Sequence, residues 1–150
     1  MKLCELLDLD TVLVDMKSAD KDEAVEELVD LLVRGDRVDD RDVVIDAVME
    51  RESQQTTGIG GGVAVPHTKH ESIQKLTAAL GISREGIEFD AIDDKPVHVV
   101  FLILARSDEP GPHVQALAEI ARLLQIPGFF RKLVEADNED DLLATIAAEE

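Results

Sequence analysis

Two histidines of this sequence follow a proline at points where the chain is about to change direction. His67 ends the segment VAVPH, which comes after the glycine run at 60–62, and His113 ends the segment EPGPH. Imidazole is a nucleophile and a proton carrier near neutral pH, and a residue at the end of an element is often presented to a cleft. We therefore expect His67, at the tip of a strand, to be a nucleophile, and His113 to assist it.

The residues around His113 indicate an anion site. Pro112 suits the first position of a helix, because its missing N–H would have no partner there. His113 then falls in the first turn, where free N–H groups and the helix dipole favour a phosphate and disfavour an imidazolium. Arg51, at the end of another expected helix, offers a planar fork that fits phosphate oxygens. The alternative for Arg51 is an exposed ion pair with Glu50 or Glu52.

The remaining histidines have simpler interpretations, with one rival. His98 lies in an apolar run and is expected to be a partly exposed strand residue, and His70 is expected on a polar surface loop. A metallohydrolase with His67, His70 and His113 as ligands is a rival, but no single acid stands out to complete the set. The glycines at 60–62 are not a nucleotide loop, since neither Gly-Lys-Ser/Thr nor a helix follows, but they would let a partner approach the backbone.

The elements that must position these residues have mixed periodicity. Apolar spacing predicts helices over 18–35, 39–52, 110–125, 127–136 and 139–148, and strands over 63–67, 77–83 and 97–107. Ser18 or Asp20 would cap the first helix, and Gly35 would end it. The helix over 110–125 is expected to bury one face, formed by Val114, Leu117, Ala118, Ala121 and Leu124. The strands lie centrally in the sequence, so we expect one α/β domain over 1–150, with a small mixed sheet flanked by helices on both sides.

Composition excludes several classes of partner. Thirty-three acidic against fifteen basic residues give a net charge of −18, which repels nucleic acid and anionic membranes and would steer a basic protein partner. The acids could instead only solvate the surface, or adapt the chain to a salty cytoplasm. No apolar run approaches the roughly 20 residues of a membrane helix, so no membrane insertion is expected. Acids within the first ten residues argue against a signal peptide, and the single Cys4 permits no internal disulfide, so we expect a cytoplasmic protein.

Three segments together resemble one known family. RESQQTTGIGGGVAVPHTKH (51–70) resembles the active-site segment of the enzyme IIA domains of the fructose–mannitol class in the bacterial phosphoenolpyruvate-dependent sugar phosphotransferase system. That class includes stand-alone nitrogen-related regulators. FDAIDDKPVHVVFLILARSD (89–108) is similar to the central strand region of the family, and HVQALAEIARLL (113–124) to its second-histidine helix. The similarity covers almost the whole chain.

The resemblance implies roles for three residues. His67 would accept a phosphoryl group from the phosphocarrier HPr and pass it to an enzyme IIB, His113 would support it, and Arg51 would stabilise the phosphate. No metal and no organic cofactor is needed for this transfer, and a nitrogen-related regulatory role is the alternative to sugar uptake. Two positions depart from the family pattern: Thr68 stands where glycine is usual, and Gly61 stands where an acid or asparagine is frequent.

The resemblance also implies a partner with an apolar patch surrounded by basic residues. Apolar candidates for the contact are Ile59, Val63, Val65, Phe129 and Phe130. The alternative is that these are core residues.

Overall fold

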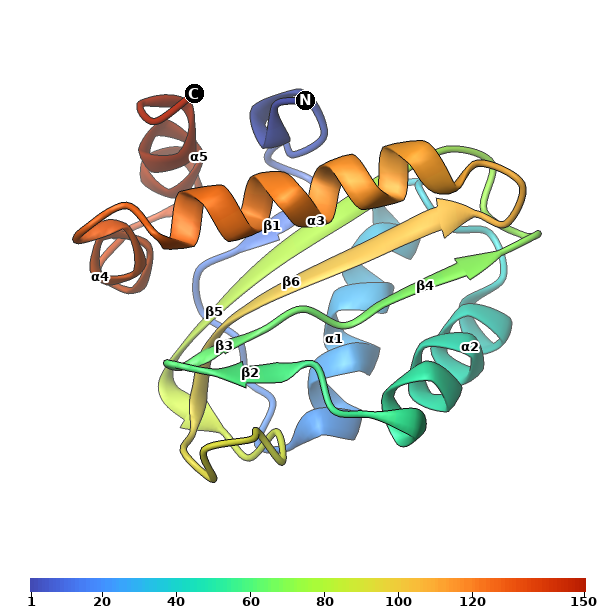
Figure 1. Cartoon of the computed structure of the whole chain (residues 1–150), viewed down its shortest axis with the longest axis horizontal. Helices are drawn as coiled ribbons and strands as arrows, with labels where there is room; N and C mark the ends of the chain where they lie inside the picture. The colour runs from blue at the N-terminus through green and yellow to red at the C-terminus, as the bar shows by residue number, and fades with distance from the viewer.

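The computed structural model describes residues 1–150 and contains a mixed six-stranded sheet with helices on both faces (Figure 1). The strands are β1 (Val12–Leu13), β2 (Gly58–Gly60), β3 (Val63–Ala64), β4 (His67–His70), β5 (Thr77–Ile87) and β6 (Val97–Arg106). The helices are α1 (Lys21–Arg34), α2 (Arg41–Gln54), α3 (Pro110–Leu124), α4 (Phe129–Val134) and α5 (Glu139–Ala147), with a 3-10 turn, η1, at Leu3–Glu5. The predicted α/β architecture is confirmed. No helix combines the length and the apolar character needed to cross a membrane.

Strand β6 is the centre of the sheet, as its apolar sequence predicts. The strand order is β1-β5-β6-β3-β2, and β4 pairs with β6 beyond the end of β3. Strand β5 is antiparallel to β6, whereas β3 and β4 are both parallel to it. Because β3 and β4 pair with successive parts of β6, the chain between Val63 and His70 follows one line along this strand.

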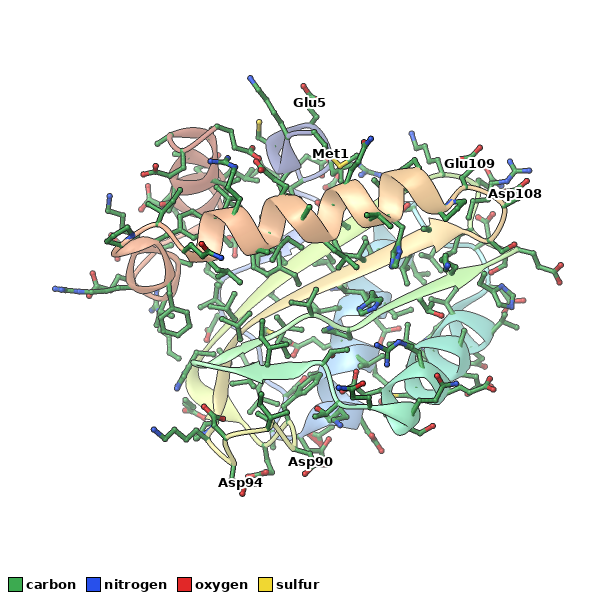
Figure 2. The ribbon with its side chains drawn as sticks, in the orientation of Figure 1. Met1, Glu5, Asp90, Asp94, Asp108 and Glu109 are labelled. Atoms are coloured by element: carbon green, nitrogen blue, oxygen red, sulfur yellow. The ribbon has the colours of Figure 1, made fainter.

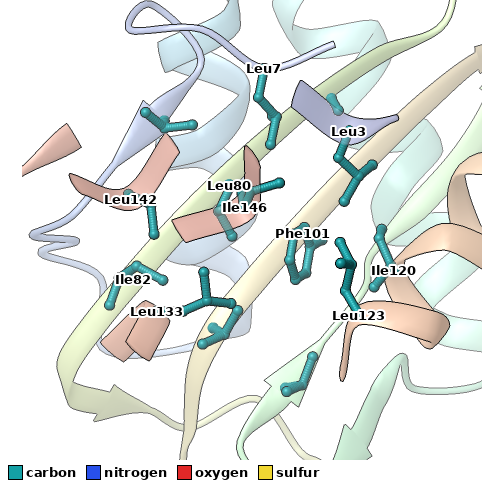
Figure 3. Close-up of a cluster of buried hydrophobic side chains, with 14 of the residues drawn as sticks. Leu3, Leu7, Leu80, Ile82, Phe101, Ile120, Leu123, Leu133, Leu142 and Ile146 are labelled. Atoms are coloured by element: carbon teal, nitrogen blue, oxygen red, sulfur yellow. The ribbon is translucent and has the colours of Figure 1, made fainter. Parts of the chain in front are cut away.

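Alternate side chains of β6 enter two separate cores. Val99, Phe101 and Ile103 pack in one core with residues of α3, α4, α5 and η1, part of which Figure 3 shows. Val100, Leu102 and Leu104 point to the opposite core, beneath α1 and α2. This alternation is the two-residue period of a strand that is buried on both faces. The helices therefore hold β6, and the strands paired with it, from both sides.

Helix α1 has the ends that the sequence predicts. The Asp20 side chain accepts a hydrogen bond from the Glu23 N–H at 2.9 Å, and Gly35 is the C-cap. A side-chain acceptor at this position satisfies an N–H that has no partner within the helix.

Helix α3 begins as predicted, but it differs from the prediction in the place of Pro112 and in its buried face. It begins at Pro110, so Pro112 is its third residue rather than its first, and His113 is its fourth. Its buried residues are His113, Ala116, Ile120 and Leu123, whereas Val114 is 62% exposed. The predicted face was wrong by about one position. The buried face includes the polar residue His113, so the spacing of the apolar residues alone did not indicate it.

The glycine run forms a hairpin turn between β2 and β3. Gly60, Gly61 and Gly62 all have positive φ angles, of 92°, 68° and 85°. Such angles are easily reached only by glycine. A Cβ atom on Gly62 would lie 2.8 Å from the ring of Phe130. The run is thus needed for the turn itself, at the end of the hairpin away from His67.

Candidate functional site

A cleft of about 490 Å³ brings the three predicted site residues together. Helix α2, strand β4 and the first turns of α3 meet around it (Figure 1). Its lining residues are Ala47, Glu50, Arg51, Gln54, His67, Thr68, Lys69, His70 and His113. All but one of these are polar, so the cleft suits a charged group rather than an apolar ligand.

His67 is the first residue of strand β4, and not the tip of the preceding strand. Pro66 interrupts the strand, but its carbonyl accepts a hydrogen bond from the Ile103 N–H at 3.0 Å. The chain then resumes pairing with β6, and His67 is in register with Ile103. The predicted strand over 63–67 is therefore divided at Val65 and Pro66, and His67 begins the second part instead of ending the first, because the Pro66 carbonyl still pairs although its N–H is missing.

A main-chain contact determines which nitrogen of His67 is free. Its Nδ1 lies 2.7 Å from the carbonyl oxygen of Val65. A carbonyl can only accept, so Nδ1 carries the proton and donates it. The ring nitrogen farther from the backbone, Nε2, then keeps its lone pair. Neutral His67 can therefore act as a nucleophile through Nε2.

His113 lies beside His67 and is almost fully buried. The two ring centroids are 5.1 Å apart and the ring planes are inclined by 45°. The His113 side chain has a buried Nε2 atom without a hydrogen-bond partner. Burial lowers the pKa of His113, and the charges of His67, Lys69 and Arg51 lower it further. A neutral imidazole with an unpaired nitrogen can thus hydrogen-bond to a group that enters the cleft.

The start of α3 offers fewer free amides than the sequence analysis predicts. Pro110 and Pro112 have no N–H, so Gly111 alone supplies one among the first three residues of the helix. Stabilisation of an anion at this end of the cleft must therefore come mainly from side chains. His113 lines the cleft, and its buried Nε2 has no hydrogen-bond partner within the protein.

Arg51 lies in the last turn of α2 and lines the cleft. Its Nη1 donates to the Gln55 carbonyl at 3.1 Å. The ion pair considered from the sequence is formed with neither Glu50 nor Glu52, and Glu52 instead turns inward and pairs with Lys21 at 3.2 Å. A guanidinium has five N–H donors, so most of those on Arg51 remain available to an anion.

Comparison with known proteins places this arrangement in a family. Residues 5–149 match the family model described as "Phosphoenolpyruvate-dependent sugar phosphotransferase system, EIIA 2". The chain belongs to the EIIA 2 family. It is 40% identical over 141 residues to a protein of Haloferax volcanii named "PTS system fructose-specific EIIA component", covering 92% of each chain.

Other EIIA 2 relatives have regulatory names. A "Nitrogen regulatory protein" of Bradyrhizobium diazoefficiens is 30% identical over 147 residues, covering 98% of this chain and 95% of the relative. The crystal structure of nitrogen regulatory protein IIA-Ntr from Neisseria meningitidis superimposes with a TM-score of 0.88 at 29% identity, covering 96% of this chain and 98% of that one. The family therefore includes similar chains with transport names and with regulatory names.

This EIIA 2 domain has a third histidine in the cleft, which the sequence analysis assigned to a surface loop. His70 is the last residue of β4, and its Nδ1 is 3.0 Å from the Ser72 N–H and 2.8 Å from the Ser72 hydroxyl. An N–H can only donate, so Nδ1 accepts and neutral His70 carries its proton on Nε2. The missed signal was the polar strand HTKH itself, which lacks the apolar residues that mark a strand.

The histidines do not assemble a metal site. No three His, Cys, Asp or Glu side chains of residues 1–150 lie close enough together to hold a metal ion. The ligand set that the metallohydrolase hypothesis requires from His67, His70 and His113 is therefore not present. His98, as expected, is a half-buried strand residue, and its Nδ1 contacts the Ser83 carbonyl at 2.8 Å.

The two departures from the family pattern lie in different places. Thr68 is half-buried and lines the cleft. Gly61 does not line it, and its N–H donates to the Asp93 carboxylate at 3.1 Å in the hairpin turn. The absence of a side chain at Gly61 therefore removes no polar group from the cleft.

A second, more apolar groove of about 290 Å³ adjoins the cleft and shares Arg51 and His67 with it. Its apolar lining consists of Ile59, Val65, Leu117, Ile120, Ala121 and Leu124. Of the apolar contact residues proposed from the sequence, Ile59 is 52% exposed and Phe130 is half-buried. Val63 and Phe129 are buried core residues, so the alternative interpretation holds for these two, whereas Val65 is buried in the same core and also lines the groove.

Proposed function

We propose that this chain is a phosphocarrier that accepts a phosphoryl group from phospho-HPr on His67 and passes it to an enzyme IIB of a fructose-type uptake system in the cytoplasm. One observation carries the proposal: the Val65 carbonyl accepts a hydrogen bond from Nδ1–H of His67, so Nε2 keeps its lone pair and can act as the nucleophile. Arg51 and His113 line the same cleft. The 40% identity to a protein named as a fructose-specific EIIA component supports the choice of sugar class.

The transfer exchanges one N–P bond for another. The lone pair of His67 Nε2 attacks the phosphorus of the donor phosphohistidine in line, and the breaking N–P bond leaves its electron pair on the donor ring nitrogen. The proton on His67 Nδ1 stays in its hydrogen bond to Val65, so the phosphorylated ring carries a positive charge next to the phosphoryl oxygens. Transfer to an enzyme IIB reverses these steps with a new acceptor, and neither direction requires a metal or a cofactor.

Arg51 and His113 supply the electrostatic support. The transition state of phosphoryl transfer spreads negative charge over three oxygens, so the positions of nearby donors decide the rate. Arg51 contributes a fixed positive charge, and the unpaired His113 Nε2 contributes a hydrogen bond. Removing one such donor costs roughly a hundredfold in rate. We therefore expect His113→Ala to be phosphorylated slowly at His67 and to pass the group on poorly.

The test is intact mass after incubation with phosphoenolpyruvate, the first enzyme of the system and HPr. One phosphoryl group should be added, and the label should be labile in acid and stable in base. His67→Ala should take no label, whereas His70→Ala, which removes a neighbouring cleft histidine, should keep it. A label that survives acid or persists in His67→Ala refutes the proposal, and a phosphate found on His113 exchanges the two roles.

A regulatory function is the second candidate, favoured by the relatives named nitrogen regulatory proteins. In this case the phosphorylated and unphosphorylated forms would bind different protein partners, and no enzyme IIB would be needed. A panel of enzyme IIB domains separates the candidates. Rapid loss of label to a fructose-class IIB favours uptake, and a label retained in the presence of every IIB favours regulation.

A further inference from the structure

Glu52, directly after Arg51, has a fully satisfied carboxylate in the protein interior. Its side chain is 1% exposed and pairs with Lys21, the first residue of α1, at 3.2 Å. It also accepts the N–H and the hydroxyl of Thr57, both at 2.7 Å. A buried carboxylate is costly without such partners, so the contacts fasten the segment that follows α2 to helix α1.

Thr57 begins a line of hydrogen bonds that reaches the proposed nucleophile. The Thr57 carbonyl accepts the Val65 N–H at 3.1 Å. The Val65 carbonyl accepts Nδ1–H of His67 at 2.7 Å. Glu52, Thr57, Val65 and His67 thus form one sequence of contacts, which we name the Glu52–His67 chain. Thr57 is thus hydrogen-bonded to the residue whose carbonyl sets the tautomer of His67.

The same carboxylate also restrains Arg51. The Arg51 guanidinium is held by the carbonyl of Gln55, which lies in the short turn between Glu52 and Thr57. The two Glu52–Thr57 contacts close this turn. One buried side chain therefore restrains two of the groups that the proposed transfer uses, although it lines neither the cleft nor the apolar groove.

We propose that Glu52 is a positioning residue for phosphoryl transfer. Through the Glu52–His67 chain it holds His67 in the Nδ1–H tautomer with Nε2 free, and through the turn at Gln55 it sets the direction of Arg51. The inference rests on the proposed function, because it concerns how ready His67 is to accept a phosphoryl group. The tautomer, however, can be measured without any transfer.

The charge on Glu52 is required for this role. A glutamine at this position has the same shape, but it accepts through one oxygen only. With that oxygen on Lys21 and the Thr57 N–H, its NH₂ group would face the Thr57 hydroxyl, which would have to turn from donor to acceptor. The contacts with Thr57 lose the strength that a charged acceptor gives, and the half-buried Lys21 loses its counter-charge. The turn should loosen, and Val65 should hold the His67 ring less firmly.

The experiment compares full-length wild type with Glu52→Gln, using ¹⁵N NMR of the His67 ring and the rate of phosphorylation by phospho-HPr. Wild-type His67 should be mainly the Nδ1–H tautomer, and Glu52→Gln should show a mixture. The phosphorylation rate should fall roughly ten- to a hundredfold, as expected for a misplaced reacting group. Glu139→Gln is the matched control, because Glu139 accepts the Val14 N–H at 2.8 Å in α5, far from α2 (Figure 1).

A double variant separates positioning from folding stability. Lys21→Met combined with Glu52→Gln removes both charges of the pair, so it should recover thermal stability while the tautomer mixture and the slow transfer persist. If Glu52→Gln does not fold, Thr57→Val removes the hydroxyl contact alone and should change the tautomer and the rate in the same direction, by less.

The positioning role is overturned if Glu52→Gln keeps the wild-type tautomer of His67 and a phosphorylation rate within twofold of wild type, whatever its melting temperature. Recovery of the rate together with the stability in the double variant also overturns it. If wild-type protein takes no phosphate on His67, the proposed function fails instead, and the tautomer comparison still decides whether Glu52 positions this ring.

Discussion

At the scale of single residues, the three cleft histidines differ in which ring nitrogen is free. The Val65 carbonyl accepts a hydrogen bond from Nδ1–H of His67, whereas the Ser72 N–H donates one to Nδ1 of His70. His113 has an unpaired Nε2 that is buried. Neutral His67 therefore offers a lone pair at Nε2, and neutral His70 offers a proton there. The difference explains how neighbouring rings of the same type can have different chemical roles.

This difference predicts opposite tautomers in one spectrum. In ¹⁵N-histidine-labelled protein near pH 8, the neutral ring of His67 should be Nδ1–H and that of His70 should be Nε2–H. Ser72→Pro removes the N–H donor and should release the His70 tautomer, while His67 is unchanged. The same tautomer for both rings in the wild type would contradict the hydrogen bonds described above.

The lowered pKa of His113 predicts a pH dependence of stability. Its pKa is lowered first by burial and then by the charges of His67, Lys69 and Arg51. The unfolded chain, with a histidine pKa of about 6.5, then binds more protons than the folded chain as pH falls below that value. The contribution of neutral His113 is complete above about pH 6.5 and is lost toward lower pH. Urea unfolding of wild type and His113→Asn between pH 5 and 8 should show a flatter profile for the variant; parallel profiles would contradict the shift.

At the scale of elements, the sequence predicted those with strong apolar periodicity and missed those defined by pairing. The apolar strand β6 and the capped helix α1 were expected correctly. Strand β4 was missed because HTKH has no apolar pattern and is a strand only through its register with β6. The buried face of α3 was misjudged because His113, which belongs to it, is polar. The residues that obscured the pattern are those that line the cleft.

Gly58, in the hairpin next to the Glu52–His67 chain, packs so closely against Ala91 that a larger side chain does not fit. A Cβ there would lie 2.7 Å from the backbone of Ala91, so Gly58→Ala must displace strand β2. We expect a loss of about 1–3 kcal/mol in the free energy of unfolding, as for other overpacked sites. Phosphorylation of His67 should also slow, because Val65 pairs with the residue before Gly58. Chemical denaturation and the phosphorylation rate are the two measurements.

Gly111→Ala is the matched control for this prediction. Gly111 lies in α3, and an added Cβ would meet nothing within 4 Å. Gly111 lies in the first turn directly before Pro112, where an added Cβ gains less than in a helix interior, so the stability should change by less than about 1 kcal/mol. An unchanged stability in Gly58→Ala would show that the backbone at Ala91 can move. A loss in Gly111→Ala as large as that expected for Gly58→Ala would contradict the open space around Gly111.

At the scale of the whole molecule, the dominant feature is the net charge of −18. Acidic residues occur at many edges of the fold; Figure 2 labels Asp90 and Asp94 in the loop between β5 and β6, and Asp108 and Glu109 before α3. The cleft differs from this surface, because Arg51 and Lys69 line it. We therefore expect the long-range field to attract a basic partner, and the charges of Arg51 and Lys69 to favour an anionic group in the cleft.

The charge should act on the rate of encounter with a basic phosphocarrier more than on the stability of the complex, because exposed charges steer association. The association rate of phospho-HPr with this chain should fall as salt shortens the Debye length from about 30 Å at 0.01 M to about 8 Å at 0.15 M, while the dissociation rate changes little. Stopped-flow mixing over a salt series, with His67→Ala to prevent transfer, measures both rates.

The matched variant Asp108→Asn with Glu109→Gln removes two acids next to α3 and should flatten the salt dependence of the association rate slightly. A rate that does not change from 0.01 to 0.15 M would leave the acids without a role in recognition. A rate that rises with salt would instead indicate a chain whose own repulsion must be screened, as expected of a protein adapted to a saline cytoplasm.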